Sequence, residues 1–254
     1  MKYFCFSDVH GDFDAMIHAL DREGYDKKNP KHRIISCGDH FGRADASNDI
    51  SGSKKVFEYL TSRDHVNMPI CLRGNHEDIL LNIFKYEHVS YIDELNGEDK
   101  TCISFMEDKR RAFELYSEST AHEHFKYIKK SGLKDWIISL PYYYETATHI
   151  LFHGWGTHNL IPESIHYKWE DAIWAKTPND IERYREAFPK YDKHKTIVFG
   201  HWGVQHLRKE LSLKNDENSL FGLWVDKDFK LIGLDGTTAF THNQLIYIFE
   251  EGET

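Results

Sequence analysis

The chain has 254 residues and a mass of 30.0 kDa, which suits a single α/β domain with a substantial buried core. Its formal net charge of −9 at pH 7 argues against general binding to nucleic acid or to an anionic membrane. No apolar run approaches the ~20 residues of a membrane-spanning helix, and no signal peptide precedes the first strand-like run, so we expect a soluble cytoplasmic protein.

The N-terminal third alternates between strand and helix patterns. Short apolar runs rich in β-forming residues occupy residues 2–6, 33–37 and 68–72. Between these runs, Asp12 is a candidate N-cap for a helix that extends to about Arg22, and Ser53 could open a second helix. This β-α-β-α-β order implies parallel strands, and ligands of parallel sheets gather beyond the carboxyl ends of the strands.

The pattern becomes helical after Glu77. Helical periodicity occupies residues 79–84, roughly 102–116 and 121–140. Pro141 ends this region. We therefore expect a helical insertion at approximately residues 78–140 within one domain of residues 1–254.

The last part of the chain returns to strand patterns. Strand-like runs occupy residues 148–152, 196–199, 220–225, 229–234 and 244–249. A helix is expected at about residues 179–188. Polar turns separate the last three runs, so we expect them to form a hairpin-rich second sheet.

Side chains of metal-binding types recur where the predicted strands end. The five fragments are Ser7-Asp8-Val9-His10-Gly11, Gly38-Asp39-His40, Gly74-Asn75-His76-Glu77, Phe152-His153-Gly154 and Gly200-His201. Carboxylates, imidazoles and amide oxygens are ligands that hold borderline divalent cations. A single fragment is more often a helix cap, a turn or a core histidine, but five fragments at strand ends together indicate a metal site.

The spacing of these residues suggests two metal positions. Asp8 and His10 are separated by one residue in a loop and could face the same cation. Asp39 has two oxygens that could bridge two cations ~3.5–4 Å apart. The ligands expected around the second cation are Asn75, His153 and His201.

These motifs resemble the calcineurin-like metallophosphoesterase superfamily. The segment Leu72-Arg73-Gly74-Asn75-His76-Glu77 is most similar to its phosphoprotein phosphatase branch, which includes bacteriophage lambda phosphatase and the symmetrical diadenosine tetraphosphate hydrolases. The resemblance implies a sandwich of two mixed β-sheets flanked by helices, with two divalent cations bridged by the attacking hydroxide. Manganese is the first choice for these cations, with iron or zinc as alternatives. The resemblance also implies that His76 is a proton donor to the leaving group and not a metal ligand.

The chain departs from the family pattern at Gly42. Family members typically read Gly-Asp-x-x-Asp-Arg-Gly, whereas this chain reads Gly38-Asp39-His40-Phe41-Gly42-Arg43-Ala44. In relatives the second Asp orients the catalytic histidine, and loss of such a partner commonly costs about 10–100-fold in metal sites. Either another acid such as Asp45 replaces it, or the enzyme works without a strong His–carboxylate pair, or the protein has a weakened or different role.

Several other residues are candidates for substrate binding. Arg43 offers a planar fork that suits phosphate oxygens, and the resemblance places it in that role. Arg73 could also approach phosphate or could pair with a buried carboxylate, and Lys176 is the nearest match to a basic residue that relatives use. Trp155 and Trp202 could form an aromatic wall for a planar group or could pack under the site.

Three functions are consistent with these features. The leading expectation is metal-dependent hydrolysis of phosphate monoesters, with a phosphoprotein or a small phosphorylated metabolite as the substrate. The enzymatic alternative is cleavage of a dinucleoside polyphosphate or of a nucleotide phosphodiester, which the two tryptophans favour. The third is a non-enzymatic binding subunit that is stabilised by metal.

Overall fold

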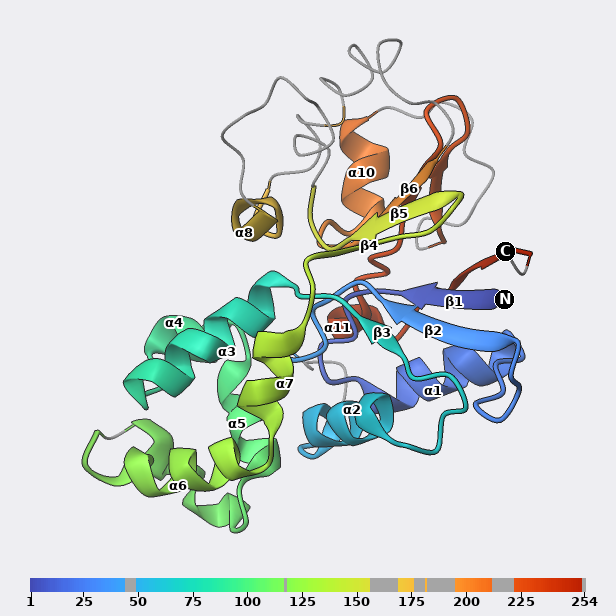
Figure 1. The fold of residues 1–254 in the computed structure, drawn as a ribbon. Helices are drawn as coiled ribbons and strands as arrows, with labels where there is room; N and C mark the ends of the chain where they lie inside the picture. Colours follow the sequence, from blue (N-terminus) through green and yellow to red (C-terminus); the bar gives the residue numbers. More distant parts are fainter. Residues whose placement is uncertain are drawn as a thin grey trace.

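Two β-sheets form the centre of the molecule, and helices flank them (Figure 1). The computed structural model describes residues 1–43, 49–116, 118–155, 169–175, 181, 195–211 and 222–252. The candidate residues Asp45 and Lys176, and nearly all of the helix expected at residues 179–188, lie outside these ranges. Among the described residues, no helix has the length and apolar character needed to cross a membrane.

The first sheet has the strand order β3-β2-β1-β9. Strands β1 (Lys2–Phe6), β2 (His32–Ser36) and β3 (Ile70–Cys71) are parallel, which confirms the parallel arrangement predicted from the sequence. Strand β9 (Tyr247–Glu250) pairs antiparallel with β1. The prediction that this last run belongs to the second sheet is therefore wrong, because a strand pattern does not specify a distant pairing partner.

The second sheet has the strand order β4-β5-β6-β8-β7. Its strands are β4 (Tyr143–Glu145), β5 (His149–Phe152), β6 (Thr196–Phe199), β7 (Trp224–Asp226) and β8 (Leu231–Gly233). Strands β7 and β8 form the expected hairpin, while β5, β6 and β8 are parallel. Strand β4 was not predicted, because it is a short edge strand whose side chains are largely exposed.

The apolar faces of the two sheets pack against each other. One buried cluster contains Cys5 and Ile35 from the first sheet and Leu151, Val198 and Ile232 from the second sheet. All four cysteines are buried and form no disulfide bond. This shared core fixes the strand ends of one sheet relative to those of the other.

Helices α1 (Phe13–Arg22) and α2 (Gly52–Thr61) pack against the first sheet. Asp12 caps α1 as predicted, because its side chain accepts a hydrogen bond from the N–H of Ala15 at 3.2 Å. On the second sheet, α10 (Val204–Glu210) contributes Val204 and Leu207 to a separate cluster. Helices therefore cover both sheets.

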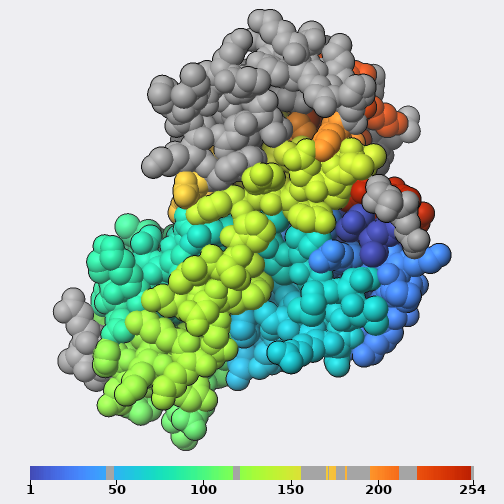
Figure 2. Space-filling model, viewed as in Figure 1, coloured from blue at the N-terminus to red at the C-terminus, as the bar shows by residue number. Residues whose placement is uncertain are grey.

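All elements between β3 and β4 are helical. They are α3 (Asn75–Tyr86), α4 (Tyr91–Leu95), α5 (Glu98–Phe105), the 3-10 helix η1 (Lys109–Tyr116), α6 (Glu118–Lys130) and α7 (Leu133–Ser139). They have a hydrophobic core of their own and gather on one side of the molecule (Figures 1 and 2). The two longer helical runs expected here are each divided, the second at Gly132, whose φ is +85°.

Candidate metal centre

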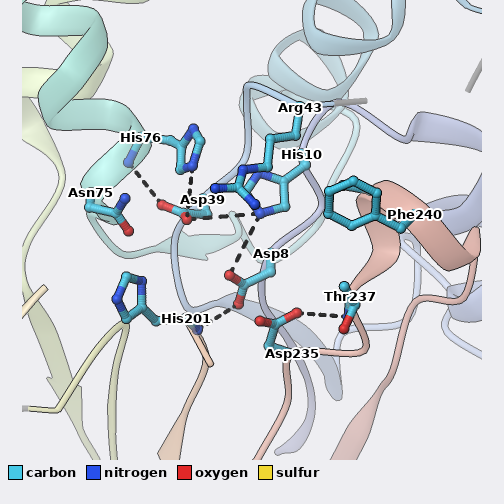
Figure 3. Close-up of a pocket in the computed structure, with 11 residues that line it drawn as sticks. Asp8, His10, Asp39, Arg43, Asn75, His76, His201, Asp235, Thr237 and Phe240 are labelled. Atoms are coloured by element: carbon cyan, nitrogen blue, oxygen red, sulfur yellow. Dashed lines mark hydrogen bonds and ion pairs between the residues drawn. The ribbon is translucent and has the colours of Figure 1, made fainter. Parts of the chain in front are cut away.

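The six predicted metal ligands converge at the carboxyl ends of strands from both sheets. Figure 3 shows five of them, and His153 contacts Asn75 and Asp39 beside these. They are Asp8 after β1, Asp39 after β2, Asn75 at the start of α3, His153 after β5, His201 after β6, and His10, which follows Asp8 in the same loop. All are buried except His201, which is half-buried. Residues nearly 200 positions apart are therefore close enough to act on one ligand.

Asp39 lies between two groups of potential ligands. One group contains His10, Asp39 and His76, the other contains Asp39, His153 and His201, and the ligand atoms in each group lie within 4.8 Å of one another. Oδ1 of Asp39 is 3.3 Å from Nε2 of His153, and its Oδ2 is 3.9 Å from Nε2 of His10. Each oxygen of Asp39 thus faces a different imidazole, as a bridging carboxylate requires.

Asp8 and Asn75 each lie beside one of these groups. Oδ1 of Asp8 is 3.8 Å from Nε2 of His10, while its Oδ2 accepts a hydrogen bond from the N–H of His201 at 2.9 Å. Oδ1 of Asn75 is 2.9 Å from Nε2 of His153. Asp8 therefore lies beside the group that contains His10, and Asn75 lies beside the group that contains His153.

The backbone at the centre is held in an unfavourable conformation. Six of the residues that line the pocket have φ in the left-handed region, namely Asp8 (58°), His10 (49°), Asp39 (53°), Arg43 (44°), His201 (68°) and Thr237 (58°). Residues other than glycine adopt this conformation at a cost of about 1–3 kcal/mol each, and such residues cluster at functional sites. The surrounding structure must therefore hold these loops in place.

Glu77 holds one of these loops. Its carboxylate accepts hydrogen bonds from the N–H groups of Asp39 at 3.0 Å, His40 at 2.9 Å and Gly74 at 2.7 Å. A Cβ on Gly74 would lie only 2.2 Å from Oδ1 of Asp39, so the close approach of the two loops requires glycine there. Glu77 and Gly74 thus position Asp39 without touching the pocket.

Backbone carbonyls orient two of the imidazoles. Nδ1 of His10 lies 3.0 Å from the carbonyl oxygen of Phe41, and Nδ1 of His153 lies 2.9 Å from that of Cys37. Because a carbonyl can only accept a hydrogen bond, each Nδ1 is the donor. Both Nε2 atoms are then turned toward Asp39, which is the arrangement usual for metal-binding histidines.

The electrostatics of the buried cluster favour a bound cation. Burial lowers the pKa of His10 and of His201 to about 3, so both imidazoles are neutral and able to ligate. Burial and the neighbouring charge of Asp235 raise the pKa of Asp8 well above its usual value. Burial would lower the pKa of His153, but Asp39 beside it raises the value to about 10. A cation at this position would take the place of that proton and offset the buried carboxylates.

Arg43 lines the mouth of the pocket together with residues from the C-terminal part of the chain (Figure 3). Its side chain points toward His10, and its Nε is buried without a hydrogen-bond partner among the described residues. A buried guanidinium donor needs an acceptor, and phosphate oxygens match its geometry. Arg43 therefore lines the same pocket as the candidate metal ligands, and its binding of phosphate stays a prediction.

Arg73 does not line the pocket. Its Nε lies 2.8 Å from Oδ1 of Asp78, and its Nη1 donates a hydrogen bond to the hydroxyl of Tyr142 at 3.1 Å. Of the two roles considered from the sequence, the structure therefore supports pairing with a carboxylate and not contact with substrate.

The two tryptophans do not form an aromatic wall. Trp155 is fully buried and contacts Phe199 edge to face, with ring centroids 5.1 Å apart. Trp202 packs against the same hydrophobic cluster on the second sheet, and neither residue lines the pocket. Their position next to the predicted histidines in the sequence does not bring their rings to the site, because both rings are turned into the core.

The aromatic ring at the pocket belongs to Phe240, which was not predicted from the sequence. It lies on the short helix α11 (Thr238–Thr241), lines the pocket and is 58% exposed. The N–H of Thr237 donates a hydrogen bond to Oδ1 of Asp235 at 2.7 Å, which ties this helix to the pocket floor. A resemblance of the nearby segment Leu234-Asp235-Gly236 to the calcineurin-like superfamily is a signal in the sequence that could have pointed to this region.

Glu98 is the second residue that was missed. Its Oε1 lies 2.5 Å from Nδ1 of His76, so the histidine does have a carboxylate partner although position 42 is glycine. Burial lowers the pKa of His76, but Asp39 and Glu98 outweigh this effect and raise it to about 9. No local motif marks Glu98, which lies 22 residues beyond His76 in the helical insertion.

A comparison with known proteins identifies the family of this chain. Residues 1–220 match the model of the calcineurin-like phosphoesterase family, so the chain belongs to this family and is a phosphoesterase. Among curated proteins, none gives a significant match.

The fold is shared with a solved structure. A protein described as a candidate diadenosine tetraphosphatase is 16% identical, with a TM-score of 0.52 over 98% of this chain and 92% of that chain. A cold-active protein-tyrosine phosphatase from a psychrophilic Shewanella species is 14% identical, with a TM-score of 0.49 over 98% and 75%. A protein serine/threonine phosphatase from Saccharomyces cerevisiae is also 14% identical, with a TM-score of 0.49 over 100% and 81%.

Proposed function

We propose that this protein is a phosphatase that hydrolyses phosphate monoesters with two divalent cations. The observation that carries the proposal is the position of Asp39 in two groups of potential ligands, in the same pocket as Arg43, whose Nε has no hydrogen-bond partner among the described residues. Oxygen and nitrogen donors of this mixture suit manganese, with iron or zinc as alternatives. Cations held there would supply Lewis-acid activation of the phosphoryl group and of the attacking water.

The protein's own residues would bind and orient the substrate. Arg43 would bind two phosphoryl oxygens through its guanidinium fork. The opening of the pocket past Phe240 and Thr237 would then direct the rest of the substrate outward. This arrangement holds the phosphorus close to Asp39.

His76 would donate the proton that the leaving group needs. Its Nδ1 is engaged by Glu98, and its Nε2 lies 3.9 Å from Oδ2 of Asp39 and faces the pocket. Because His76 also belongs to one group of potential ligands, its role as an acid and not as a ligand is part of the proposal. A positioned general acid typically contributes about 10²–10⁴-fold to the rate.

Cleavage of a dinucleoside polyphosphate is the second candidate, and Phe240 is the observation that favours it. An exposed ring at the rim of a phosphate pocket could stack on a base or on another planar group. The hypothesis of a non-enzymatic subunit depended on Gly42 and loses that support, because Glu98 supplies a carboxylate to His76.

A substrate panel with Mn²⁺ tests the proposal. The panel contains p-nitrophenyl phosphate, bis-p-nitrophenyl phosphate, a phosphoserine peptide and diadenosine tetraphosphate. We expect monoesters to be cleaved with the highest kcat/KM and activity to disappear with a chelator. A preference for diadenosine tetraphosphate would establish the second candidate, and inactivity toward every substrate would contradict both.

A further inference from the structure

The helical insertion contributes a carboxylate to the active site. Glu98 is the first residue of α5 and is completely buried, and its Oε1 contacts Nδ1 of His76 at 2.5 Å. Its other oxygen, Oε2, has no hydrogen-bond partner among the described residues. A buried carboxylate is costly for the fold, so its presence beside a site histidine calls for a functional explanation.

Gly42 makes room for this carboxylate. The residue has φ of +81°, and a Cβ there would lie 2.4 Å from Nδ1 of His76 and 2.8 Å from Oε1 of Glu98. A side chain at position 42 and the present position of Glu98 therefore exclude each other. The glycine that departs from the family pattern and the glutamate of the insertion are two parts of one arrangement.

Further contacts fix α5 against the loop that carries Gly42. The N–H of Gly42 donates to the hydroxyl oxygen of Thr101 at 2.9 Å, and the N–H of Arg43 donates to the carbonyl of Asn96 at 2.9 Å. A Cβ on Gly97 would lie 2.3 Å from the backbone nitrogen of Arg43, so the two segments are in direct backbone contact. These contacts fix the backbone on both sides of Glu98, and so they hold its carboxylate beside His76.

We propose that Glu98 is the positioning residue for His76, and that the helical insertion thereby completes the active site. Glu98 accepts the Nδ1–H of His76 and keeps Nε2 directed at the pocket. The inference depends on the proposed role of His76 as the acid. In the reaction, the oxygen of water bonds to phosphorus, the ester P–O bond breaks, and the leaving oxygen takes the proton from Nε2. The attacking water releases one proton, which restores the proton on Nε2. The proton on Nδ1 stays on the imidazole and remains hydrogen-bonded to Glu98.

Kinetics of Glu98→Gln and Glu98→Ala test this role. For an alkyl phosphate with a poor leaving group, we expect kcat to fall about 10–100-fold, more in the alanine variant, since glutamine keeps an acceptor oxygen. For p-nitrophenyl phosphate the loss should be much smaller, because that leaving group needs little protonation. KM and bound metal should not change.

Asp99→Asn is the matched control. Asp99 is the neighbouring buried carboxylate on α5, and the hydroxyl of Tyr116 donates to it at 3.1 Å. Asp99 does not line the pocket, so this variant should keep the wild-type dependence on the leaving group. If Glu98→Ala lost activity equally toward both leaving groups, or if Asp99→Asn behaved like it, Glu98 would be merely structural.

A double variant and a spectroscopic measurement separate this inference from the proposed function. Adding Glu98→Ala to His76→Ala should cause no further loss of kcat, and an additive loss would overturn the inference. In NMR spectra of the protein without added Mn²⁺, the Nδ1 proton of His76 should be visible in the wild type and lost in Glu98→Ala. This readout decides the positioning role even if every phosphate ester in the panel proves inert, and a spectrum unchanged by Glu98→Ala would exclude it.

Discussion

Oδ1 of Asp39 lies 3.3 Å from Nε2 of His153, and this contact joins the end of β2 in one sheet to the end of β5 in the other. The remaining oxygen of Asp39 faces His10 at 3.9 Å. One carboxylate therefore joins potential ligands from both sheets, and we expect its charge to be needed at both proposed metal positions.

The first prediction concerns Asp39→Asn. Because the amide offers only one oxygen and no charge, we expect the variant to lose bound metal and to lose at least about 10²-fold in kcat. Elemental analysis and kinetics with p-nitrophenyl phosphate measure the two effects. Asp64→Asn, at an exposed carboxylate, is the control and should behave as the wild type. Two equivalents of metal in an Asp39→Asn variant with normal turnover would remove the bridging role.

The second prediction distinguishes an acid from a ligand at position 76. We expect His76→Ala to keep its metal while kcat toward an alkyl phosphate falls about 10²–10⁴-fold, the usual contribution of a general acid. The loss should shrink toward p-nitrophenyl phosphate. Loss of one equivalent of metal would instead identify His76 as a ligand.

The third prediction reverses what the sequence suggested about Gly42. Without knowledge of Glu98, Gly42→Asp would be expected to restore a partner for His76. The structure predicts lower activity and a lower Tm, because the new side chain would collide with His76 and Glu98. Gly24→Asp is the matched control, since Gly24 also has positive φ (+74°) but its Cβ would meet no described atom within 4 Å. The control should lose only about 1–2 kcal/mol from backbone strain, and a Gly42→Asp variant with raised kcat would contradict this account.

The sequence predicted the elements that follow from local periodicity. The capped helix at Asp12 and the parallel strands β1 to β3 have strong local patterns, and the structure confirms them. The pairing of β9 with β1 was missed because it joins residues about 245 positions apart, for example Lys2 with Glu250. Side-chain alternation shows that a strand exists, but not which edge it joins.

The same distinction holds for the site. The motifs at the strand ends predicted which candidate ligands lie close together, because the carboxyl ends of parallel strands converge. Glu98 and Phe240 could not be predicted in this way, since their roles depend on how an insertion and a late helix pack against the pocket. Trp155 is close to His153 in the sequence, but its ring is buried in the core, so the prediction that it lines the site is wrong.

The fourth prediction concerns the pH dependence of stability. His149 is buried, stacks on Phe249 with ring centroids 3.6 Å apart, and burial lowers its pKa from 6.5 to about 4. Between pH 6.5 and about pH 4, the unfolded chain therefore binds a proton at His149 that the folded protein does not bind. The contribution of neutral His149 is fully present above pH 6.5 and is lost as the pH falls toward 4, by on the order of 2–3 kcal/mol.

Denaturant unfolding between pH 4 and pH 7.5 measures this effect. In His149→Phe, which keeps an aromatic ring at the stack, the free energy of unfolding should decline less steeply with acidification than in the wild type. A variant at the exposed His18, His18→Gln, should keep the wild-type slope. Identical slopes for His149→Phe and the wild type would show that His149 does not titrate in this way.

The fifth prediction concerns Phe240, at the rim of the pocket. If its ring stacks on planar substrates, Phe240→Ala should raise KM several-fold for p-nitrophenyl phosphate and for nucleotides, as expected for a loss of about 1 kcal/mol. KM for glycerol phosphate should not change. Phe113→Ala removes another exposed phenylalanine, from the helical insertion, and is the control. Equal effects on planar and aliphatic substrates would exclude stacking.

The left-handed backbone at Asp8, His10, Asp39, Arg43 and His201 has a consequence for evolution and engineering of this protein. At each of these positions glycine would relieve conformational strain, so selection for thermal stability alone favours the loss of the very side chains that we propose bind metal and phosphate. Stability and activity are therefore opposed within a few residues of each other. Thermostable variants of this protein are best sought in the sheets and the outer helices, away from the loops at the strand ends.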